Sequence, residues 1–278
     1  MSMLLLSQAR SFLFVPGNRP ERFAKALASG ADAVIVDLED AVPLDAKDAA
    51  RAALAAAWPG FDAAQRAGLL VRVNPAGTPW HEADLALLAS LPGLGAVMLP
   101  KAENPQQIER AFHACGVPVL PLIESAEGVG QMDAMARAEG VLRLGLGHID
   151  LQADLGMRCG PDEAELAPIR LALVVASRRA GLPAPVDGVT TATTDAQVLA
   201  QDAQRSRRFG FGAKLCIHPA QVVGVHQALA PTEAECAWAE RVLAAQAQAR
   251  GGAFSVDGKM VDPPVLLLAR QILQAPHA

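Results

Sequence analysis

Cysteine is scarce in this chain, and its four cysteines stand far apart. Cys115, Cys159, Cys216 and Cys236 form no CxxC pair. Structural zinc sites and disulfide frameworks both depend on cysteines at characteristic spacings. We therefore expect neither, and we interpret the four side chains as reduced thiols of a cytoplasmic protein.

Long hydrophobic runs are also lacking. The segment MSMLLLSQARSF has only a short apolar run before Arg10, which does not match the hydrophobic region of a signal peptide. No stretch of about 20 uncharged apolar residues occurs elsewhere, so we expect no membrane-spanning helix and no membrane partner.

The chain has no excess of positive charge. With 24 Lys and Arg against 29 Asp and Glu, its net charge is -5, which excludes the electrostatic footprint of a nucleic-acid-binding protein. The phosphate-binding patterns GxxxxGK[ST] and GxGxxG are absent, as is the GxSxG turn of acyl-transfer enzymes. A small anionic substrate must therefore meet individual arginines.

Short apolar runs are abundant and alternate with alanine-rich helical segments. This alternation predicts βαβ units and a parallel sheet. A closed (β/α)8 TIM barrel fits both the number of runs and the length of the chain, and a doubly wound open sheet is the alternative. The predicted strands are 11–15, 33–37, 69–73, 95–99, 117–122, 141–146, 184–188 and 213–217.

The pattern changes after residue 230. Thr232 and Glu235 have the spacing of a capping box at the start of a helix. A glycine-bearing hinge, a turn at Asp257-Gly258 and a last helix entered through Pro263-Pro264 follow. We expect a barrel domain over 1–230 and a helical extension over 231–278, which acts as a lid or as an arm onto a neighbouring subunit.

Acidic residues stand where predicted strands end. Asp37, Glu39 and Asp40 end one run, Glu124 follows another, and Asp150 follows the next. Strand ends of a parallel barrel converge on the face that carries active sites. Carboxylates gathered there need a compensating charge, and Mg2+ prefers such oxygen ligands. Glu124 and Asp150 are the predicted metal ligands, with solvated loop acids or helix caps as the alternative.

Two arginines are candidates for binding a substrate carboxylate. Arg72 lies inside an apolar strand, where a charge is costly unless it is paired. Its guanidinium suits bidentate binding of a carboxylate, and a structural salt bridge to Asp37 or Glu39 is the alternative. Arg10 is also predicted to bind substrate, although its place before the first strand indicates the opposite barrel end unless that strand is shorter than drawn. His148 is predicted to be a polar loop residue, and a ligand or base is the alternative.

Several stretches resemble one family in sequence and in order. They are RSFLFVPGNRPERFAKALASGADAVIVDLEDAV, VRVN, LPKAE, PLIESAEGV, GLGHIDLQADLG, AKLCIHPAQV and GKMVDPP, and they run from about residue 10 to about residue 273. They resemble the HpcH/HpaI aldolase/citrate lyase family, in its citrate lyase beta-subunit-like branch. The resemblance implies a TIM barrel with a C-terminal helical extension, assembled as a homotrimer or hexamer.

The resemblance also implies a reaction and a set of site residues. It implies Mg2+ on Glu124 and Asp150, substrate binding by Arg72 and Glu124, and an acid/base role for Asp262 in a neighbour's active site. Glu39 and Asp40 are expected to assist catalysis by holding waters of the metal or by orienting Arg72. The implied reaction is the reversible cleavage of a carboxylated 3-hydroxyacyl-CoA, such as citryl-CoA or malyl-CoA, to acetyl-CoA and a 2-oxo acid. An acyl-CoA thioesterase, an aldolase acting on free acids and a non-enzymatic binding protein are the alternatives.

Overall fold

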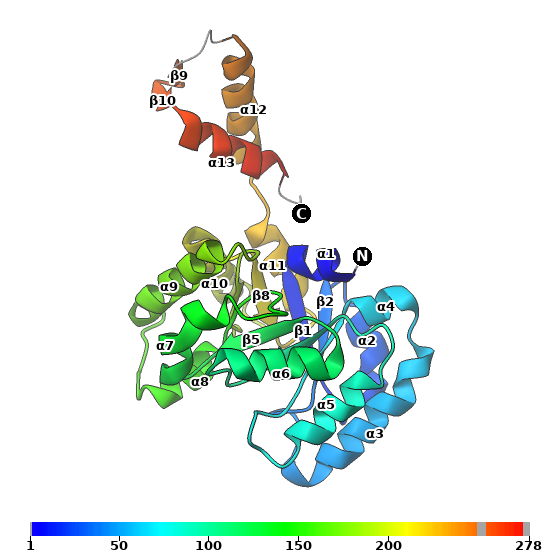
Figure 1. The fold of residues 1–278 in the computed structure, drawn as a ribbon. Helices are drawn as coiled ribbons and strands as arrows, with labels where there is room; N and C mark the ends of the chain where they lie inside the picture. Colours follow the sequence, from blue (N-terminus) through cyan, green and yellow to red (C-terminus); the bar gives the residue numbers. More distant parts are fainter. Residues whose placement is uncertain (1, 249–253, 275–278) are drawn as a thin grey trace. The chain divides into compact units, whose positions relative to one another are not determined.

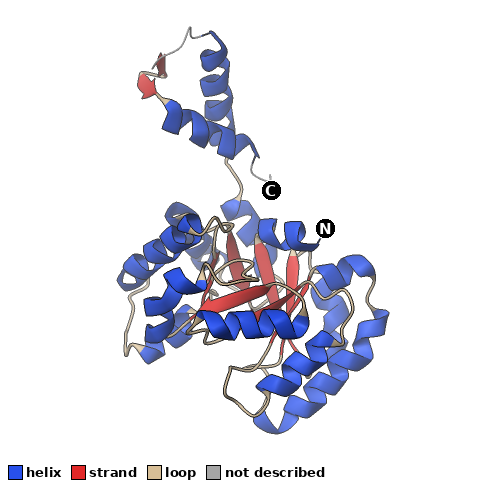
Figure 2. Cartoon of the chain, in the orientation of Figure 1, coloured by secondary structure: helices blue, strands red, loops and turns tan. Residues whose placement is uncertain are grey.

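The computed structural model describes residues 2–248 and 254–274. The chain divides into two compact units, Met1–Ala228 and Leu229–Ala278. Figure 1 shows the path of the chain, and Figure 2 shows helices surrounding a central sheet in the first unit. No helix in the described ranges is both long enough and apolar enough to cross a membrane.

The first unit is a closed barrel of eight parallel strands in chain order. This confirms the predicted (β/α)8 fold. Each predicted apolar run overlaps one strand, because strands covered by helices outside and packed side chains inside are apolar on both faces. The strands are β1 Ser11–Pro16, β2 Ala33–Asp37, β3 Leu69–Arg72, β4 Ala96–Leu99, β5 Val119–Ile123, β6 Gly145–Leu146, β7 Val186–Asp187 and β8 Ala213–Cys216.

Helices follow the strands and cover the outside of the barrel (Figure 2). They are α2 Phe23–Leu27, α3 Lys47–Ala57, α4 Ala63–Ala67, α5 His81–Ala89, α6 Pro105–Cys115, α7 Ala126–Met135, α8 His148–Asp154, α9 Ala167–Arg179, α10 Ala196–Phe209 and α11 Gln221–Leu229, with short 3-10 turns at Pro20–Arg22, Leu44–Ala46, Trp58–Gly60 and Ala164–Leu166. One further helix, α1 Ser2–Gln8, precedes β1, and its Leu6 packs into the barrel core. Side-chain caps begin several of them: Ser125 accepts a hydrogen bond from Gly128 N, and Asp195 accepts from Gln197 N and Val198 N. Such caps satisfy backbone donors that a helix start leaves unpaired.

The barrel interior is filled by alternate side chains of the strands. Phe12, Ile35, Leu70 and Met98 are fully buried members of one core cluster. The strand register shows which residues lie side by side at the carboxyl end of the barrel. Pro16 pairs with Asp37, and Asp37 pairs with Arg72. The acid and the arginine are therefore neighbours at the same level of the barrel, on the face where active sites of this fold lie.

The amino end of the barrel is closed by polar contacts, and Arg10 belongs to it. Arg10 N donates to Asp32 Oδ2 at 2.7 Å, its Nε lies 3.8 Å from the same oxygen, and its carbonyl accepts from Lys214 N at 2.9 Å. β1 begins at Ser11, as predicted, so the residue before it lies on the face opposite the carboxyl end. The expectation that Arg10 binds substrate is therefore corrected.

The second unit is a helical hairpin with a small sheet. It contains α12 Glu233–Gln248, β9 Phe254–Val256, β10 Lys259–Val261 and α13 Pro263–Gln274. The predicted capping box is present, since Glu235 N donates to Thr232 Oγ1 at 3.2 Å and Thr232 N donates to Glu235 Oε2 at 2.7 Å. Asp257 and Gly258, both with positive φ, connect β9 and β10. The predicted glycine hinge at 251–252 lies outside the described residues.

Candidate active site

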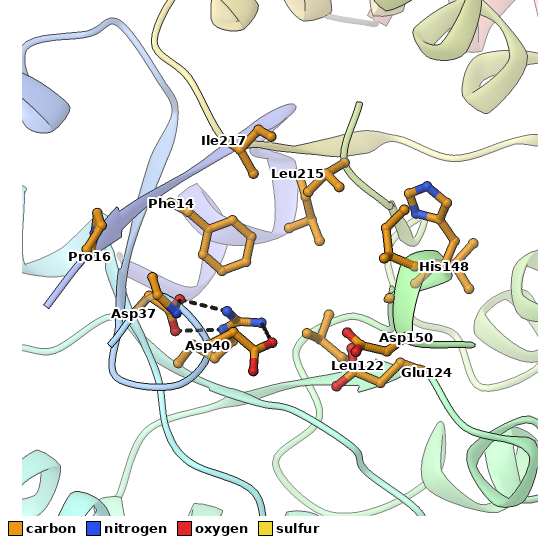
Figure 3. A pocket seen from close by; sticks show the side chains of 16 residues that line it. Phe14, Pro16, Asp37, Asp40, Leu122, Glu124, His148, Asp150, Leu215 and Ile217 are labelled. Atoms are coloured by element: carbon orange, nitrogen blue, oxygen red, sulfur yellow. Dashed lines mark hydrogen bonds and ion pairs between the residues drawn. The ribbon is translucent and has the colours of Figure 1, made fainter. Parts of the chain in front are cut away.

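A cavity of about 410 Å³ opens at the carboxyl end of the barrel. Figure 3 shows side chains from several strand ends pointing into it. One side carries acids and an arginine, and the other side is largely apolar. The lining residues are Phe14, Pro16, Asp37, Asp40, Ala41, Arg72, Leu122, Glu124, Leu146, Gly147, His148, Ile149, Asp150, Val189, Leu215 and Ile217.

Arg72 is held rigidly on the acidic side. Its Nε and Nη2 donate to the two oxygens of Asp37 at 2.7 and 2.6 Å, and its guanidinium carbon lies 4.8 Å from the centre of the Phe14 ring. Burial alone would lower the pKa of Arg72, but the charge and hydrogen bonds of Asp37, together with Glu39, raise it overall. Substrate binding and a structural salt bridge were the two alternatives for Arg72. In the structure Arg72 makes the salt bridge to Asp37 and also lines the cavity.

The DLED segment after β2 is folded by its own side chains. Asp37 accepts hydrogen bonds from Glu39 N at 2.9 Å and from Ala41 N at 3.1 Å, which is a local turn that aspartate favours. From α3, Lys47 Nζ donates to the carbonyls of Leu38 and Glu39, both at 2.7 Å. The turn is therefore fixed from both sides.

Glu39 is the buried acid of this turn. Arg72 Nη1 lies 2.9 Å from its Oε2, and Lys101 Nζ lies 3.4 Å from its Oε1, yet neither oxygen has a well-aligned hydrogen bond from the described residues. Burial, then the charge of Asp40, raises the pKa of Glu39 to about 7 against the opposing effect of Arg72. Asp40 is more exposed, with an oxygen 3.7 Å from Arg72 Nη1.

Glu124 is almost completely buried, with 3% of its surface exposed. Its Oε1 accepts a hydrogen bond from Lys101 N at 2.7 Å. Burial, followed by the charges of Glu39 and Asp150, raises its pKa to about 8. A Cβ on Gly147 would lie 2.0 Å from Glu124 Oε2, so this position in the loop after β6 requires glycine. Close backbone packing therefore fixes the carboxylate next to α8.

Glu124 and Asp150 fit the requirements of a Mg2+ site. Both line the cavity, Figure 3 shows their carboxylates next to each other, and the charge of Asp150 raises the pKa of Glu124. Glu124 is buried and Asp150 is partly buried, and two neighbouring carboxylates repel each other unless a cation binds between them. In the described ranges no three His, Cys, Asp or Glu side chains gather as a metal cluster. Two carboxylates suit Mg2+, which keeps several exchangeable ligands.

The structure brings most of the predicted site residues together. Arg72, Asp40, Glu124 and Asp150 line the cavity, and Glu39 lies beneath Arg72 through their ion pair. Asp262 belongs to the second unit, where its Oδ1 accepts from Val265 N at 3.3 Å at the start of α13. His148 is the buried first residue of α8, so its interpretation as a loop residue was wrong.

Three contributors were missed by sequence reasoning. Phe14 supports Arg72, Lys101 donates to Glu124 through its backbone N–H, and Glu163 contacts His148. Lys101 adopts a φ of 47°, a left-handed conformation that is costly for a side chain other than glycine. The segment LPKAE carries part of the family resemblance, but nothing in those letters reveals the backbone conformation.

Comparisons with known proteins identify the family to which this chain belongs. The family model HpcH/HpaI aldolase/citrate lyase matches residues 10–219. A citrate lyase subunit beta-like protein of Deinococcus radiodurans is 39% identical over 95% of this chain and 96% of its own length. A (3S)-malyl-CoA thioesterase of Cereibacter sphaeroides is 35% identical over 97% of this chain and 95% of its own length.

A solved structure extends the comparison to bound molecules. The CitE protein of Mycobacterium tuberculosis, in complex with magnesium, acetoacetate and coenzyme A, superposes with a TM-score of 0.85 at 36% identity, covering 97% of this chain and 98% of that one. A further structure of the citrate lyase beta subunit from the same organism holds oxaloacetate and magnesium, with a TM-score of 0.72 at 34% identity over 83% of this chain and all of that one.

Proposed function

Because the chain belongs to the HpcH/HpaI aldolase/citrate lyase family, we propose that it is a Mg2+-dependent carbon–carbon lyase. Its substrate is a carboxylated 3-hydroxyacyl-CoA, which it cleaves to acetyl-CoA and a 2-oxo acid or forms from them. The observation that carries the proposal is the acidic pair Glu124 and Asp150 together with Arg72 in one cavity. This arrangement provides a metal site and a carboxylate-binding cation within one small volume.

Glu124 and Asp150 hold the Mg2+ in this proposal. The bound ion would supply Lewis-acid polarisation of the substrate oxygens, the chemistry that an oxo–hydroxyl interconversion needs. The magnesium in the related CitE structures supports this choice of ion. Glu39 and Asp40 assist by setting the position of Arg72 and by accepting hydrogen bonds from waters at the edge of the acidic side.

Arg72 binds the carboxylate that the cleavage leaves on the 2-oxo acid. Asp37 occupies Nε and Nη2, so the guanidinium keeps one fixed orientation and its remaining N–H groups serve the substrate. The Phe14 ring covers one face of the guanidinium and excludes water from it. Because the guanidinium is already oriented, little reorganisation energy is needed when negative charge develops on the substrate.

Cleavage of the carbon–carbon bond requires one proton to leave the substrate and one proton to be added to it, so no net proton is released. The 3-hydroxyl loses its proton, the bond electrons pass to the acetyl-CoA carbon, and that carbon takes up one proton. We propose Asp262 as the acid/base group, acting from the extension 231–278 as a lid on a neighbouring subunit of a homotrimer or hexamer. A carboxyl group can exchange this proton when it lies within hydrogen-bond reach of the reacting carbon.

The cavity lining favours a 2-oxo acid with one carboxylate. Among the described lining residues Arg72 is the only lysine or arginine, and Leu146, Val189, Leu215 and Ile217 are apolar. A second carboxylate there would be desolvated without a partner. We therefore propose glyoxylate or pyruvate as the 2-oxo product, from malyl-CoA or citramalyl-CoA, in preference to oxaloacetate from citryl-CoA.

A thioesterase is the second candidate function. The observation that favours it is the 35% identity to a (3S)-malyl-CoA thioesterase over nearly the full length of both chains. Hydrolysis adds water across the thioester and releases free CoA and a hydroxy diacid. The carbon–carbon bond then stays intact, so the products separate the two functions.

Product analysis tests the proposed function. Purified protein is incubated with malyl-CoA, citramalyl-CoA and citryl-CoA, each with Mg2+ or with EDTA. We expect acetyl-CoA and a 2-oxo acid only with Mg2+, and turnover of the first two esters about tenfold or more above citryl-CoA, since one unpaired buried charge costs over about 1.4 kcal/mol. Free CoA without a 2-oxo acid establishes the thioesterase instead, and faster citryl-CoA cleavage contradicts the argument that the cavity suits only one carboxylate.

Subunit mixing tests the role of Asp262. We expect Asp262→Asn and Glu124→Gln each to be nearly inactive alone, and mixtures of the two to regain activity because one subunit keeps its metal site and the other keeps its acid. The measurement is activity across mixing ratios after subunit exchange, with Asp257→Asn as the control from the same unit. If no ratio restores activity, Asp262 does not act in a neighbour's site.

A further inference from the structure

A buried charge cluster lies between the barrel wall and the outer helices, behind the cavity. It joins residues of β7 and β8 to residues of α9, α10 and the segment before α9. Arg170 Nε lies 3.3 Å from Asp187 Oδ1, and both side chains are at most 1% exposed. Lys214, equally buried, donates from Nζ to Gly188 O at 2.7 Å. The proposed function gives this cluster no role.

Glu163 connects the cluster to the cavity. Its Oε2 accepts hydrogen bonds from Arg170 Nη2 and, at 2.8 Å, from Arg205 Nη2. Its Oε1 lies 3.3 Å from Nε2 of His148. Although burial opposes ionisation, the contacts to His148 and Arg170 lower the pKa of Glu163 to about 2. A carboxylate in this state only accepts hydrogen bonds, so His148 Nε2 must carry a hydrogen.

His148 is clamped from both sides by this cluster. Its side chain is buried, and Nδ1 has no hydrogen-bond partner among the described residues. A Cβ on Gly188 would lie 2.0 Å from Nδ1, so the ring packs directly against the backbone that Lys214 holds. Figure 3 shows the imidazole apart from the carboxylates of Glu124 and Asp150. The ring therefore supports the site and does not belong to the acidic pair.

The clamp acts on the turn that carries Asp150. His148 is the first residue of α8 and Asp150 the third, so both lie in one helical turn. The turn has no side-chain cap on its preceding residue, Gly147. A helix start without a cap is easily distorted unless another contact fixes it. The 3.3 Å contact between His148 Nε2 and Glu163 Oε1 is such a contact.

We propose that Glu163 is a positioning residue, which fixes His148 and thereby places the Asp150 carboxylate beside Glu124 for the metal. The inference rests on the proposed function in one respect, that Asp150 holds Mg2+. Glu163 also has a φ of 48°, a left-handed conformation that is unfavourable for a residue with a Cβ. Strain of this kind persists where surrounding contacts over-determine the residue.

In Glu163→Gln the side chain at position 163 presents a donor instead of an acceptor to His148. Arg170 and Arg205 can only donate, so the amide oxygen of Glu163→Gln must face them. The amide NH2 group then faces His148 Nε2, where two donors oppose each other. The imidazole can avoid this only by carrying its hydrogen on Nδ1, which faces Gly188 without an acceptor among the described residues. We expect the ring to shift and the first turn of α8 to shift with it.

Direct Mg2+ binding tests the inference on the full-length protein. Calorimetric titration with MgCl2 should give a dissociation constant about tenfold higher for Glu163→Gln than for the parent, as for other residues that orient metal ligands. Glu165→Gln is the matched control, because this exposed acid on the same segment accepts from Gly160 N, at 3.3 and 3.2 Å, and does not line the cavity. Histidine-selective 15N NMR should show the Nε2–H form of His148 in the parent and its loss in Glu163→Gln.

The outcomes separate this inference from the proposed function. If the parent binds Mg2+ and a folded Glu163→Gln binds it equally well, the positioning role is wrong and the metal site stands. If the parent binds no Mg2+, the metal assignment is wrong and the inference falls with it. Where Glu163→Gln does not fold, His148→Gln keeps an N–H donor for Glu163 and His148→Leu does not. We expect weaker Mg2+ binding only in His148→Leu, and equal affinities in these two variants overturn the proposal.

Discussion

Glu124→Gln and Asp150→Asn should each abolish Mg2+ binding and lower activity by about 1000-fold or more. Each change removes one of the two acids that face each other in the cavity while keeping the shape of the side chain. A Lewis-acid metal contributes several kcal/mol to the transition state, and each step of about 1.4 kcal/mol is a factor of ten in rate. Calorimetric titration and the product assay measure the two losses.

The fold should survive both changes. In Glu124→Gln the amide oxygen can still accept the hydrogen bond that Lys101 N gives to Glu124. Because burial raises the pKa of Glu124 to about 8, its ionised form is unfavourable in the metal-free fold. We therefore expect a melting temperature in EDTA no lower than that of the parent. Asp154→Asn is the matched control on α8, and full activity in Glu124→Gln or Asp150→Asn would contradict the metal assignment.

Arg72→Lys should lower kcat/KM by about 100-fold or more. The guanidinium serves Asp37 through two parallel hydrogen bonds and Glu39 through a further contact. An ammonium group cannot reproduce this fork and still reach the substrate carboxylate. Losing a charge-assisted pair in a desolvated site costs about 3 kcal/mol, which corresponds to the stated factor. Steady-state kinetics with the best CoA ester measure the effect.

Arg66→Lys is the matched control for this change. Arg66 also stacks on an aromatic ring, that of Trp58 at 6.0 Å, and donates to a carbonyl, but it lies away from the cavity. Kinetic constants within error of the parent are expected for it. A small effect of Arg72→Lys, comparable to that of Arg66→Lys, would make Arg72 a structural residue that only pairs with Asp37 and Glu39.

The barrel could be predicted because its strands are buried on both faces. Runs such as AVIVD and AKLCI are largely apolar, and each contains a strand in the structure. The lengths were less predictable. The run at 141–146 forms a strand only at Gly145–Leu146, and Val141 makes an isolated bridge to Val119 before it. Between them, the fully buried Arg143 donates from its side chain to the carbonyls of Ala9 and Ala184. Such side-chain contacts join residues that are far apart in the sequence, so the local pattern does not predict them.

The candidate site was predictable where it depends on strand ends. Arg72, Glu124 and Asp150 each end or follow a strand, and the barrel brings such positions together. Arg10 failed because it precedes its strand, which places it at the other end with Asp32. Glu163 could not be found, since its contact to His148 depends on the packing of α9 against the barrel and leaves no local pattern.

The most direct test of the lyase mechanism is the hydrogen content of the acetyl-CoA formed in D2O. The protein is incubated with malyl-CoA or citramalyl-CoA and Mg2+, and the products are analysed by mass spectrometry at early times. Cleavage of the carbon–carbon bond with protonation of the new methyl group predicts acetyl-CoA carrying one deuterium, together with glyoxylate or pyruvate. Release of free CoA and an intact hydroxy diacid, with no acetyl-CoA, would contradict that mechanism.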